Sequence, residues 1–375
     1  MRILFFIALL IVGTAFSGIE EEKKKYPKDY FRSPVNRNIQ LAGTFGELRP
    51  NHFHAGIDIK GKVGETIYAV AEGYVARIKI QSGGYGKVLY IKHPNGYTSV
   101  YAHLQKMTKE LEAYVKQFQY KRESFEVELF PSPGQFAFAK GEPIAKMGVS
   151  GRSYGPHLHF EIRDTETEKP INPLLFGLKV ADNVPPKLHQ LKAYFLNDRR
   201  ETLHSQTFKL IKTRQGYRIK GDTLELGAWR TGFGLKVYDH MTGVSNWNGI
   251  YSLQMFQDSV EVYSFEMETF AFSESRYINA HLDYEEQVSK KSYFNRCYRL
   301  PGNRLTIYPE RIDGGVIQLH QNKSSEIRLL AKDLAGNSAE LRFWVKRSEV
   351  KAPREKLFTY FLPYNEENLI ENPSL

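Results

Sequence analysis

Cysteine is almost absent from this chain of 375 residues, which contains only Cys297. A single cysteine cannot form an intrachain disulfide, so the fold must be held by core burial and by any bound metal. Cys297 also lies far too late in the chain to be the lipid-modified cysteine that follows the signal of a lipoprotein. Its simplest interpretation is a small apolar side chain in the core.

Long apolar runs are missing after the N-terminus. Residues 1–17 contain Arg2, an apolar run over residues 3–12 and small residues before Ser17, a pattern typical of a signal peptide cut near Ser17. A membrane anchor is the competing interpretation, but the run is shorter than the roughly 20 residues that a spanning helix needs. We therefore expect an exported protein of the periplasm or cell envelope, without a stable membrane anchor. Residues 18–38 read as a solvated leader.

Nucleic-acid-binding motifs and internal repeats of fixed period are also missing. The formal net charge of +10 favours anionic polymers as partners. For an exported protein these polymers are envelope material rather than nucleic acid. We therefore expect no nucleic-acid partner.

Short strand-like segments dominate what is present. Residues 39–180 alternate apolar and polar side chains between glycine turns, as in "TIYAVAEGYVARIKI" and "GGYGKVLYIKH". Many strands and short turns predict an antiparallel β domain, so the fold class is mainly β.

One segment, residues 105–140, departs from the strand pattern. Met107, Leu111, Val115 and Phe118 recur at helical spacing before "FEVELF" returns to alternation. We expect a helical insertion and a strand beside the β core. Its helix either packs on the core or forms one wall of a cleft.

A second region is expected after the proline-containing linker "DNVPPKL", residues 182–188. The chain is long enough for two domains, and "GIYSLQMFQDSVEVYSFEM" and "EIRLLAKDLAGNSAELRFWVK" read as strand pairs joined by polar turns. Residues 181–347 resemble a bacterial immunoglobulin-like β-sandwich, with residues 270–322 as an irregular elaboration. Residues 348–375 form a polar C-terminal tail.

The stretch "GPHLHFEIRD" carries the clearest chemical signal. In a strand, side chains alternate between faces, so His157, His159 and Glu161 share one side while the apolar residues between them share the other. Two histidines two positions apart can aim two imidazole nitrogens at one point. Glu161 could orient one of these imidazoles or be a solvated carboxylate.

Two further stretches add polar residues. In "HAGID" an even separation places His54 and Asp58 on one face of an extended segment, with small residues between them. In "YAHL" His103 shares a strand face with Tyr101 and Ser99. Imidazole and carboxylate suit zinc, and three protein ligands with a fourth position for water are typical of a catalytic site. Each stretch alone also occurs by chance.

Taken together, in order, these stretches resemble the M23 family of lysostaphin and LytM-type zinc metalloendopeptidases. The resemblance covers residues 44–175 and includes "HAGIDIKG", "SVYAHL", "KGEPIAKMGVSGRSYGPHLHFEIRD" and "PINP". It implies a LytM-type antiparallel β-sheet peptidase domain over residues 39–180. The stretch 105–140 is longer than the connection expected in the family.

The resemblance also implies roles for individual residues. His54, Asp58 and His159 match the family's zinc ligands, one Zn²⁺ per chain, and His157 and His103 match its two catalytic histidines. His157 is then the group that takes the proton of water, and His103 steadies the oxyanion. These two roles could be exchanged.

The remaining histidines do not lie within comparable motifs of the sequence. His52 lies outside the ligand pattern and is expected on the surface or a cleft wall. The other six are expected to be structural or exposed: His93, His189, His204, His240, His281 and His320.

The leading hypothesis is an exported zinc endopeptidase that hydrolyses peptide cross-links of bacterial peptidoglycan. One rival is a latent or non-hydrolytic module that binds the wall or activates other wall hydrolases, although such members lack ligands that this chain keeps. Another rival is a zinc peptidase acting on proteins. Peptidoglycan peptide stems are the expected partner, and the C-terminal region is a candidate docking surface for envelope proteins.

Overall fold

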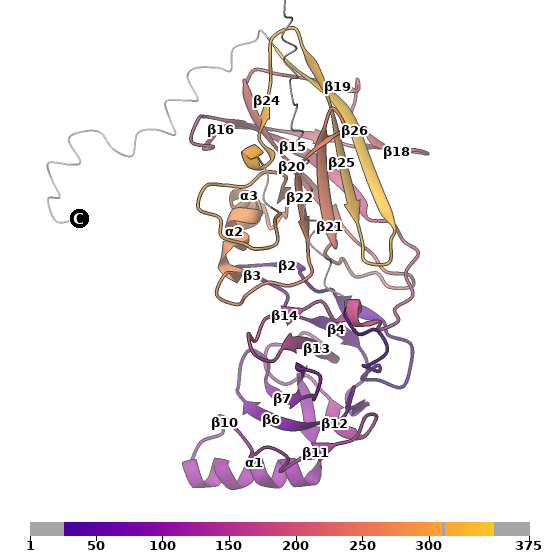
Figure 1. Cartoon of the computed structure of the whole chain (residues 1–375), viewed down its shortest axis with the longest axis vertical. Helices are drawn as coiled ribbons and strands as arrows, with labels where there is room; N and C mark the ends of the chain where they lie inside the picture. The colour runs from indigo at the N-terminus through magenta and orange to yellow at the C-terminus, as the bar shows by residue number, and fades with distance from the viewer. Residues whose placement is uncertain (1–25, 310–311, 349–375) are drawn as a thin grey trace, which may run out of the picture.

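The computed structural model describes residues 26–309 and 312–348. The expected signal peptide, residues 18–25 of the leader and the tail from residue 349 onward lie outside the described residues. Strands, most of them paired antiparallel, far outnumber helices in the described chain, which confirms the mainly-β prediction. Figure 1 shows an elongated molecule in which the indigo and magenta strands of the first half lie below the orange and yellow strands of the second.

The first half is built on one large sheet of nine strands. Along its main path the order is β1 (Leu41–Gly43), β4 (Ile57–Lys60), β13 (His157–Asp164), β8 (Tyr97–Ala102), β7 (Lys87–Lys92), β6 (Gly73–Ile80) and β10 (Val127–Leu129). Off this path, β11 (Ala137–Phe138) pairs with β6, and β14 (Pro170–Ile171) pairs with β13. β13 therefore lies between β4 and β8. β4 carries Asp58, and His103 directly follows β8.

Apolar and polar side chains alternate along β13, so one face of the strand packs on the core. Leu158, Phe160 and Ile162 are 0% exposed and face the main core. The ring of Phe160 lies 5.4 Å from that of Tyr101 on the neighbouring strand β8. A smaller sheet of β5 (Thr66–Tyr68), β12 (Pro143–Met147) and β9 (Leu104–Met107) accompanies the large one. The opposite face of β13 is left for polar side chains.

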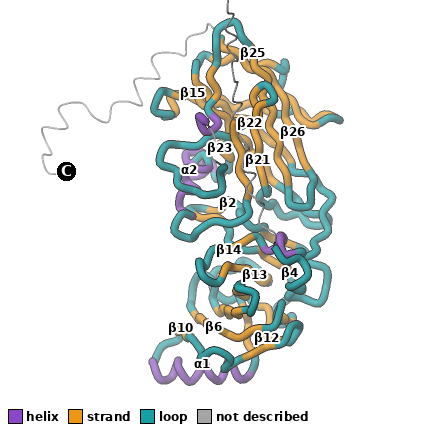
Figure 2. The backbone as a smooth tube through the Cα atoms, viewed as in Figure 1, coloured by secondary structure: helices purple, strands orange, loops and turns teal. Residues whose placement is uncertain are grey.

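The predicted helix in the insertion is present as α1 (Lys109–Arg122). Thr108 caps its N-terminus by accepting a hydrogen bond from the backbone of Leu111. Leu111 and Val115 are buried in the main core, so α1 packs on the β domain. Met107, expected on the helix, instead ends strand β9. Figure 2 shows α1 at the end of the molecule remote from the C-terminal sheets.

The described part of the expected leader, residues 26–38, packs in part against the β domain and is not solvated throughout. Tyr26, Phe31 and Val35 are at most 9% exposed and belong to the main core. The backbone of Arg32 donates a hydrogen bond to the carbonyl of Val70 at 2.9 Å. The prediction failed because charged residues dominate the local composition, whereas burial of the few aromatic and apolar side chains decides the packing.

The C-terminal region contains two sheets. One has the path β16 (Thr202–Lys209), β15 (Lys187–Leu196), β20 (Arg230–Tyr238) and β23 (Asn295–Arg296), with β24 (Ile317–Gln318) also paired to β20. The other has the path β17 (Ile211–Thr213), β18 (Gly216–Arg218), β26 (Ser338–Arg347), β25 (Ser324–Lys332), β21 (Ser252–Gln257) and β22 (Val260–Glu266), with β19 (Thr223–Leu226) paired to β26. Phe233 and Phe343, one from each sheet, meet at 5.2 Å in the core.

Both predicted strand pairs are confirmed. β21 and β22 form a hairpin, as do β25 and β26. Asp258 and Ser259 turn the first hairpin with positive φ angles, which matches the right-handed twist of its strands. Cys297 is buried, as predicted. The immunoglobulin-like topology stays a prediction, and among the described residues no helix is long and apolar enough to cross a membrane.

The two halves meet around the hairpin of β2 (Leu48–Arg49) and β3 (His52–Phe53). This hairpin lies beside the short helices of the C-terminal region in Figure 1. The ring of Phe53 contacts that of Phe270 at 5.4 Å, and its backbone N–H donates to Ser275 Oγ at 3.1 Å. The remaining helices are η1 (Pro173–Phe176), η2 (Ser275–Tyr277), α2 (Ile278–His281), α3 (Tyr284–Lys290) and η3 (Ile312–Gly315).

Candidate metal centre and flanking histidines

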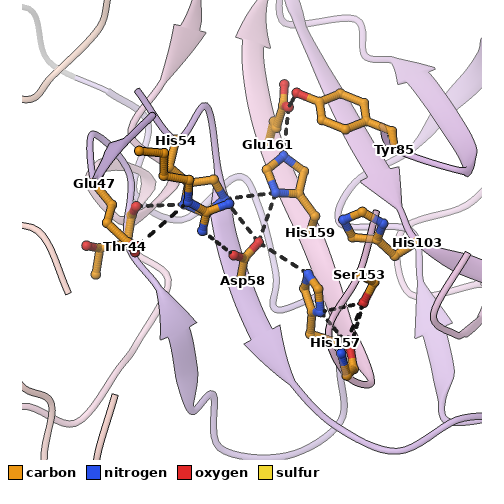
Figure 3. A network of polar contacts seen from close by, with 12 residues as sticks. Thr44, Glu47, His54, Asp58, Tyr85, His103, Ser153, His157, His159 and Glu161 are labelled. Atoms are coloured by element: carbon orange, nitrogen blue, oxygen red, sulfur yellow. Dashed lines mark hydrogen bonds and ion pairs between the residues drawn. The ribbon is translucent and has the colours of Figure 1, made fainter. Parts of the chain in front are cut away.

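The register between β4 and β13 places Asp58 directly opposite His159. Asp58 Oδ1 lies 2.9 Å from His159 Nδ1 and 3.0 Å from His54 Nε2. The two imidazole nitrogens are themselves 2.9 Å apart. One ligand atom from each of these three buried residues therefore converges on one point, and the group could hold a metal ion (Figure 3).

Gly56 makes this close approach possible. A Cβ at this position would lie 2.4 Å from the carbonyl oxygen of Phe160 and 3.1 Å from the ring of His159. Any side chain here would therefore push β13 away from the segment that carries His54. The small residue expected between the two ligands is required by the backbone packing.

Hydrogen bonds determine which nitrogen of each imidazole faces the cluster. His54 Nδ1 lies 2.8 Å from the carbonyl oxygen of Thr44, and His159 Nε2 lies 2.8 Å from Glu161 Oε1. Because a carbonyl and a carboxylate only accept, each of these nitrogens carries the hydrogen and donates. In the neutral rings that a metal ion requires, His54 Nε2 and His159 Nδ1 would be the two nitrogens that offer lone pairs, and both lie beside Asp58.

The electrostatics of the cluster centre on Asp58. Burial would raise the pKa of its carboxyl, but His54 and His159 hold the pKa well below its usual range. Its second oxygen, Oδ2, accepts a hydrogen bond from Arg49 Nη2 at 2.7 Å. Burial lowers the pKa of His54 to about 4. Although burial opposes charge on His159, its hydrogen bonds to Asp58 and Glu161 raise its pKa to about 9.

Glu161 belongs to the support of the cluster rather than to a solvated face. It is 0% exposed, and its Oε2 accepts a hydrogen bond from Arg163 Nε at 2.6 Å. The hydroxyl of Tyr85 donates to Glu161 Oε1. Burial alone would raise the pKa of Glu161, but Arg163 and His159 lower it to about 2. Glu161 is therefore an ionised acceptor for His159.

Sequence reasoning missed four residues that support the cluster: Thr44, Arg49, Tyr85 and Arg163. Arg163 had a usable signal, because it follows Glu161 by two positions and so shares its strand face. The other three reach the cluster through tertiary contacts, for which the local sequence offers no periodicity.

His157 and His103 lie side by side next to the cluster. Their ring centroids are 4.7 Å apart, and His157 Nε2 lies 3.6 Å from Asp58 Oδ1. His157 Nδ1 donates to the carbonyl of Gly155 at 2.8 Å, and His103 Nδ1 donates to that of Ser150 at 2.8 Å. Each histidine therefore keeps Nε2 free of these backbone contacts. Burial, with His159 nearby, lowers the pKa of His103 to about 4.

The strand-face expectation for His103 is wrong. Tyr101 pairs with the core residue Phe160 across β8 and β13, whereas Ala102 pairs with His159. Strict alternation would therefore send His103 to the core side with Tyr101. Instead His103 has a φ of 59°, in the left-handed region, between the ends of β8 and β9. This break in the alternation turns the ring toward His157.

The other histidines stand apart from the cluster. His52 is exposed, and its Nδ1 donates to the carbonyl of Pro50 at 2.9 Å. His93 and His281 are buried and hydrogen-bonded within their own domains. The remaining four are partly or fully exposed: His189, His204, His240 and His320.

Comparison with known protein families gives one match, to peptidase family M23, over residues 52–120. This range includes His54, Asp58 and His103 and ends before His157. The Haemophilus influenzae protein named "Uncharacterized metalloprotease" is 30% identical over 160 residues, 40% of this chain and 28% of its own length. The DD-carboxypeptidase/endopeptidase Mpg of Neisseria meningitidis is 33% identical over 125 residues, 33% of this chain and 23% of its own.

A relative that is named as an activator rather than as a peptidase also matches. The murein hydrolase activator NlpD of Escherichia coli is 36% identical over 121 residues, 32% of this chain and 25% of its own length. Among solved structures, a zinc-containing peptidase from Vibrio cholerae is 24% identical, with a TM-score of 0.30 over 41% of each chain. The chain thus spans roughly a quarter of the length of the curated relatives named here.

Proposed function

Since the chain carries a peptidase family M23 domain, we propose that it is an exported zinc endopeptidase that hydrolyses peptide cross-links of bacterial peptidoglycan. The observation that carries this proposal is the convergence of His54, Asp58 and His159, with His157 and His103 directly beside them. The expected signal peptide and the name of the neisserial endopeptidase relative support the exported, wall-directed part.

The three residues of the cluster fit zinc. Two imidazoles and one carboxylate are a common ligand set for a catalytic zinc, which keeps a fourth position open. Zinc bonds of 2.0–2.2 Å in a tetrahedral arrangement separate ligand atoms by about 3.3 Å, close to the 2.9–3.0 Å found between the three atoms. When bound, zinc lowers the pKa of water to about 7 and polarises a carbonyl oxygen.

The flanking histidines supply the proton transfers. His157 Nε2, 3.6 Å from Asp58 Oδ1, accepts the proton of the attacking water and later delivers a proton to the leaving amine. His103 would steady the developing oxyanion by donating from Nε2; because its Nδ1 hydrogen is held by Ser150, the Nε2 proton would come from solvent and return to it when the oxyanion collapses. The carbonyls of Gly155 and Ser150 hold both rings with Nε2 free for these steps.

A second candidate function is that of a wall-binding or latent module that activates other hydrolases. The name of the Escherichia coli relative favours it. In this case the C-terminal sheets would dock an envelope protein. The complete set of ligand and flanking histidines favours the hydrolase, because an activator has no chemical need for His157 and His103.

Zinc content and cleavage of purified sacculi test the proposal separately. The full chain should bind about one zinc, and His159→Ala should lose it. His157→Ala should keep zinc but release no new amino groups from sacculi. His52→Ala is the matched control and should behave as wild type, since His52 is exposed and outside the cluster.

The result that overturns the proposal differs for each assay. A wild-type chain without zinc would exclude the enzymatic interpretation. Zinc binding without cleavage, together with increased cleavage by a second wall hydrolase, would establish the activator. Mass analysis of released muropeptides identifies the cross-link that is cut.

A further inference from the structure

A second group of acidic side chains lies where the two halves of the chain meet. Asp182 belongs to the connection between the halves, Asp239 follows strand β20, and Asp333 follows strand β25. One carboxylate oxygen of each lies within 4.8 Å of the others. They line a pocket of about 130 Å³ whose other walls include Thr44 and Asn172 of the first half. The cluster is therefore open to small solutes.

The negative charge of this cluster is not compensated. Asp239 is 1% exposed, and its Oδ1 has no hydrogen-bond partner. Asp182 Oδ2 is likewise without a partner. Within residues 26–309 and 312–348, no lysine, arginine or histidine forms an ion pair with any of the three carboxylates. Buried carboxylates normally pair with a cation or bind a metal.

Asn248 gives independent support for a ligand site beside these carboxylates. Its backbone exchanges two hydrogen bonds of 2.9 Å with that of Asp239. Residues paired in this way project their side chains from the same face. Asn248 is 1% exposed, and neither Oδ1 nor Nδ2 has a partner. A buried, unsatisfied amide thus lies on the side of Asp239 that carries its carboxylate.

We propose that Asp182, Asp239 and Asp333 bind Ca²⁺, with the amide oxygen of Asn248 as a further ligand. All four donors are oxygens, which hard cations prefer, whereas zinc takes nitrogen or sulfur as well. Calcium accepts six to eight oxygens in irregular arrangements and completes its shell with water, which the pocket admits. Magnesium demands a near-ideal octahedron that three loops of different origin are less suited to form.

The surroundings agree with this assignment. Burial and the two neighbouring aspartates raise the pKa of Asp239 to about 7, so a proton and a cation would compete for the same carboxylate. Asn337 already joins two of the loops, because its Nδ2 donates to Asp333 Oδ2 at 2.8 Å and to the carbonyl of Asp182 at 3.3 Å. Calcium would tie the connection between the halves to the C-terminal sheets.

Calcium titration of the full chain, already loaded with zinc and freed of calcium, tests the proposal. Calorimetry should show about one Ca²⁺ per chain with a Kd between about 10⁻⁵ and 10⁻³ M. The Tm should rise with the logarithm of calcium concentration. Asp239→Asn, which keeps the shape of the side chain, should lose both effects while its Tm without calcium is equal to or higher than that of wild type.

Two controls separate this site from others. Asp198→Asn removes a carboxylate whose side chain is 81% exposed and should titrate as wild type. Zinc content should be the same in all variants, because the cluster of His54 lies elsewhere. The proposal is overturned if wild type shows neither heat nor a Tm shift with calcium in the millimolar range, if Asp239→Asn still binds calcium, or if magnesium binds equally well.

Discussion

The carbonyl oxygen of Thr44 accepts the Nδ1 hydrogen of His54 at 2.8 Å, which directs the lone pair of the other nitrogen toward Asp58. The hydroxyl of Thr44 accepts a hydrogen bond from the backbone N–H of Gly249 at 3.0 Å and donates to its carbonyl at 3.3 Å. Gly249 belongs to the C-terminal region. That region therefore supports the residue that orients a proposed zinc ligand.

Replacing Thr44 by Val should weaken zinc binding without removing any ligand. The backbone carbonyl stays, but the N–H of Gly249 loses its partner and the segment before His54 loses an anchor. Loss of such indirect support typically costs about tenfold in metal affinity. Competition with a chromophoric chelator would measure it, and Thr44→Ser, which keeps the hydroxyl, should bind zinc as wild type. Equal affinities for Val and Ser would contradict the idea.

Glu161→Gln should affect both zinc affinity and stability. The substitution removes the charge that accepts from His159 and pairs with Arg163. Leaving a buried cation without its main partner costs about 3 kcal/mol, and loss of the oriented imidazole should lower zinc affinity about 10- to 100-fold. Urea unfolding and chelator competition give the two values.

The matched control for Glu161 is Glu168→Gln. Glu168 also contacts Arg163, at 3.1 Å, but its side chain is 55% exposed. Solvent screens that ion pair, so the variant should stay within about 0.5 kcal/mol of wild type. If both variants lose similar stability, the burial of Glu161 is not the cause.

His103→Asn should separate catalysis from metal binding. Asparagine tolerates the left-handed backbone that His103 adopts, so the fold should be retained. Without an imidazole at this position, cleavage of sacculi should fall about 10²- to 10⁴-fold, whereas zinc content should not change. Loss of zinc in this variant would instead show that His103 supports the ligands.

The pH dependence of stability should reveal the buried Asp239. Its pKa of about 7 in the folded chain lies above the unfolded value of about 3.9. The folded state therefore keeps a proton that the unfolded state loses, and the resulting stability falls as the pH rises from about 4 to about 7. Free energies of unfolding without calcium, compared between wild type and Asp239→Asn, should show a slope in the difference over this range.

The control is the same unfolding measurement with calcium added. A bound cation would replace the proton on Asp239, so added calcium should restore the stability of wild type near pH 7 and leave Asp239→Asn unchanged. A difference between the two chains that is constant across the whole range would show that Asp239 does not titrate as expected. Asp182 and Asp333 are the charged groups that face Asp239.

Much of the candidate site could be predicted from patterns along one strand. The alternation that placed His157, His159 and Glu161 on one face follows from backbone sterics, which act between neighbouring residues. The same reasoning failed at His103, because a single left-handed residue reverses the face that alternation assigns. The packing of Phe31 was missed because the charged residues around it in the sequence suggest a solvated segment, whereas its own side chain is buried in the core.

Local sequence patterns predicted several of the strands, including the hairpins β21–β22 and β25–β26, an amphipathic helix within residues 105–140, and the residue types that could carry metal chemistry. These depend on local periodicity and on the chemistry of side chains. The pairing of Asp58 with His159, the support of Thr44 by Gly249 and the meeting of three distant aspartates become visible in the folded chain alone. The register of the strands and the contacts between the two halves of the chain depend on how whole sheets pack together. No short stretch of sequence contains that information.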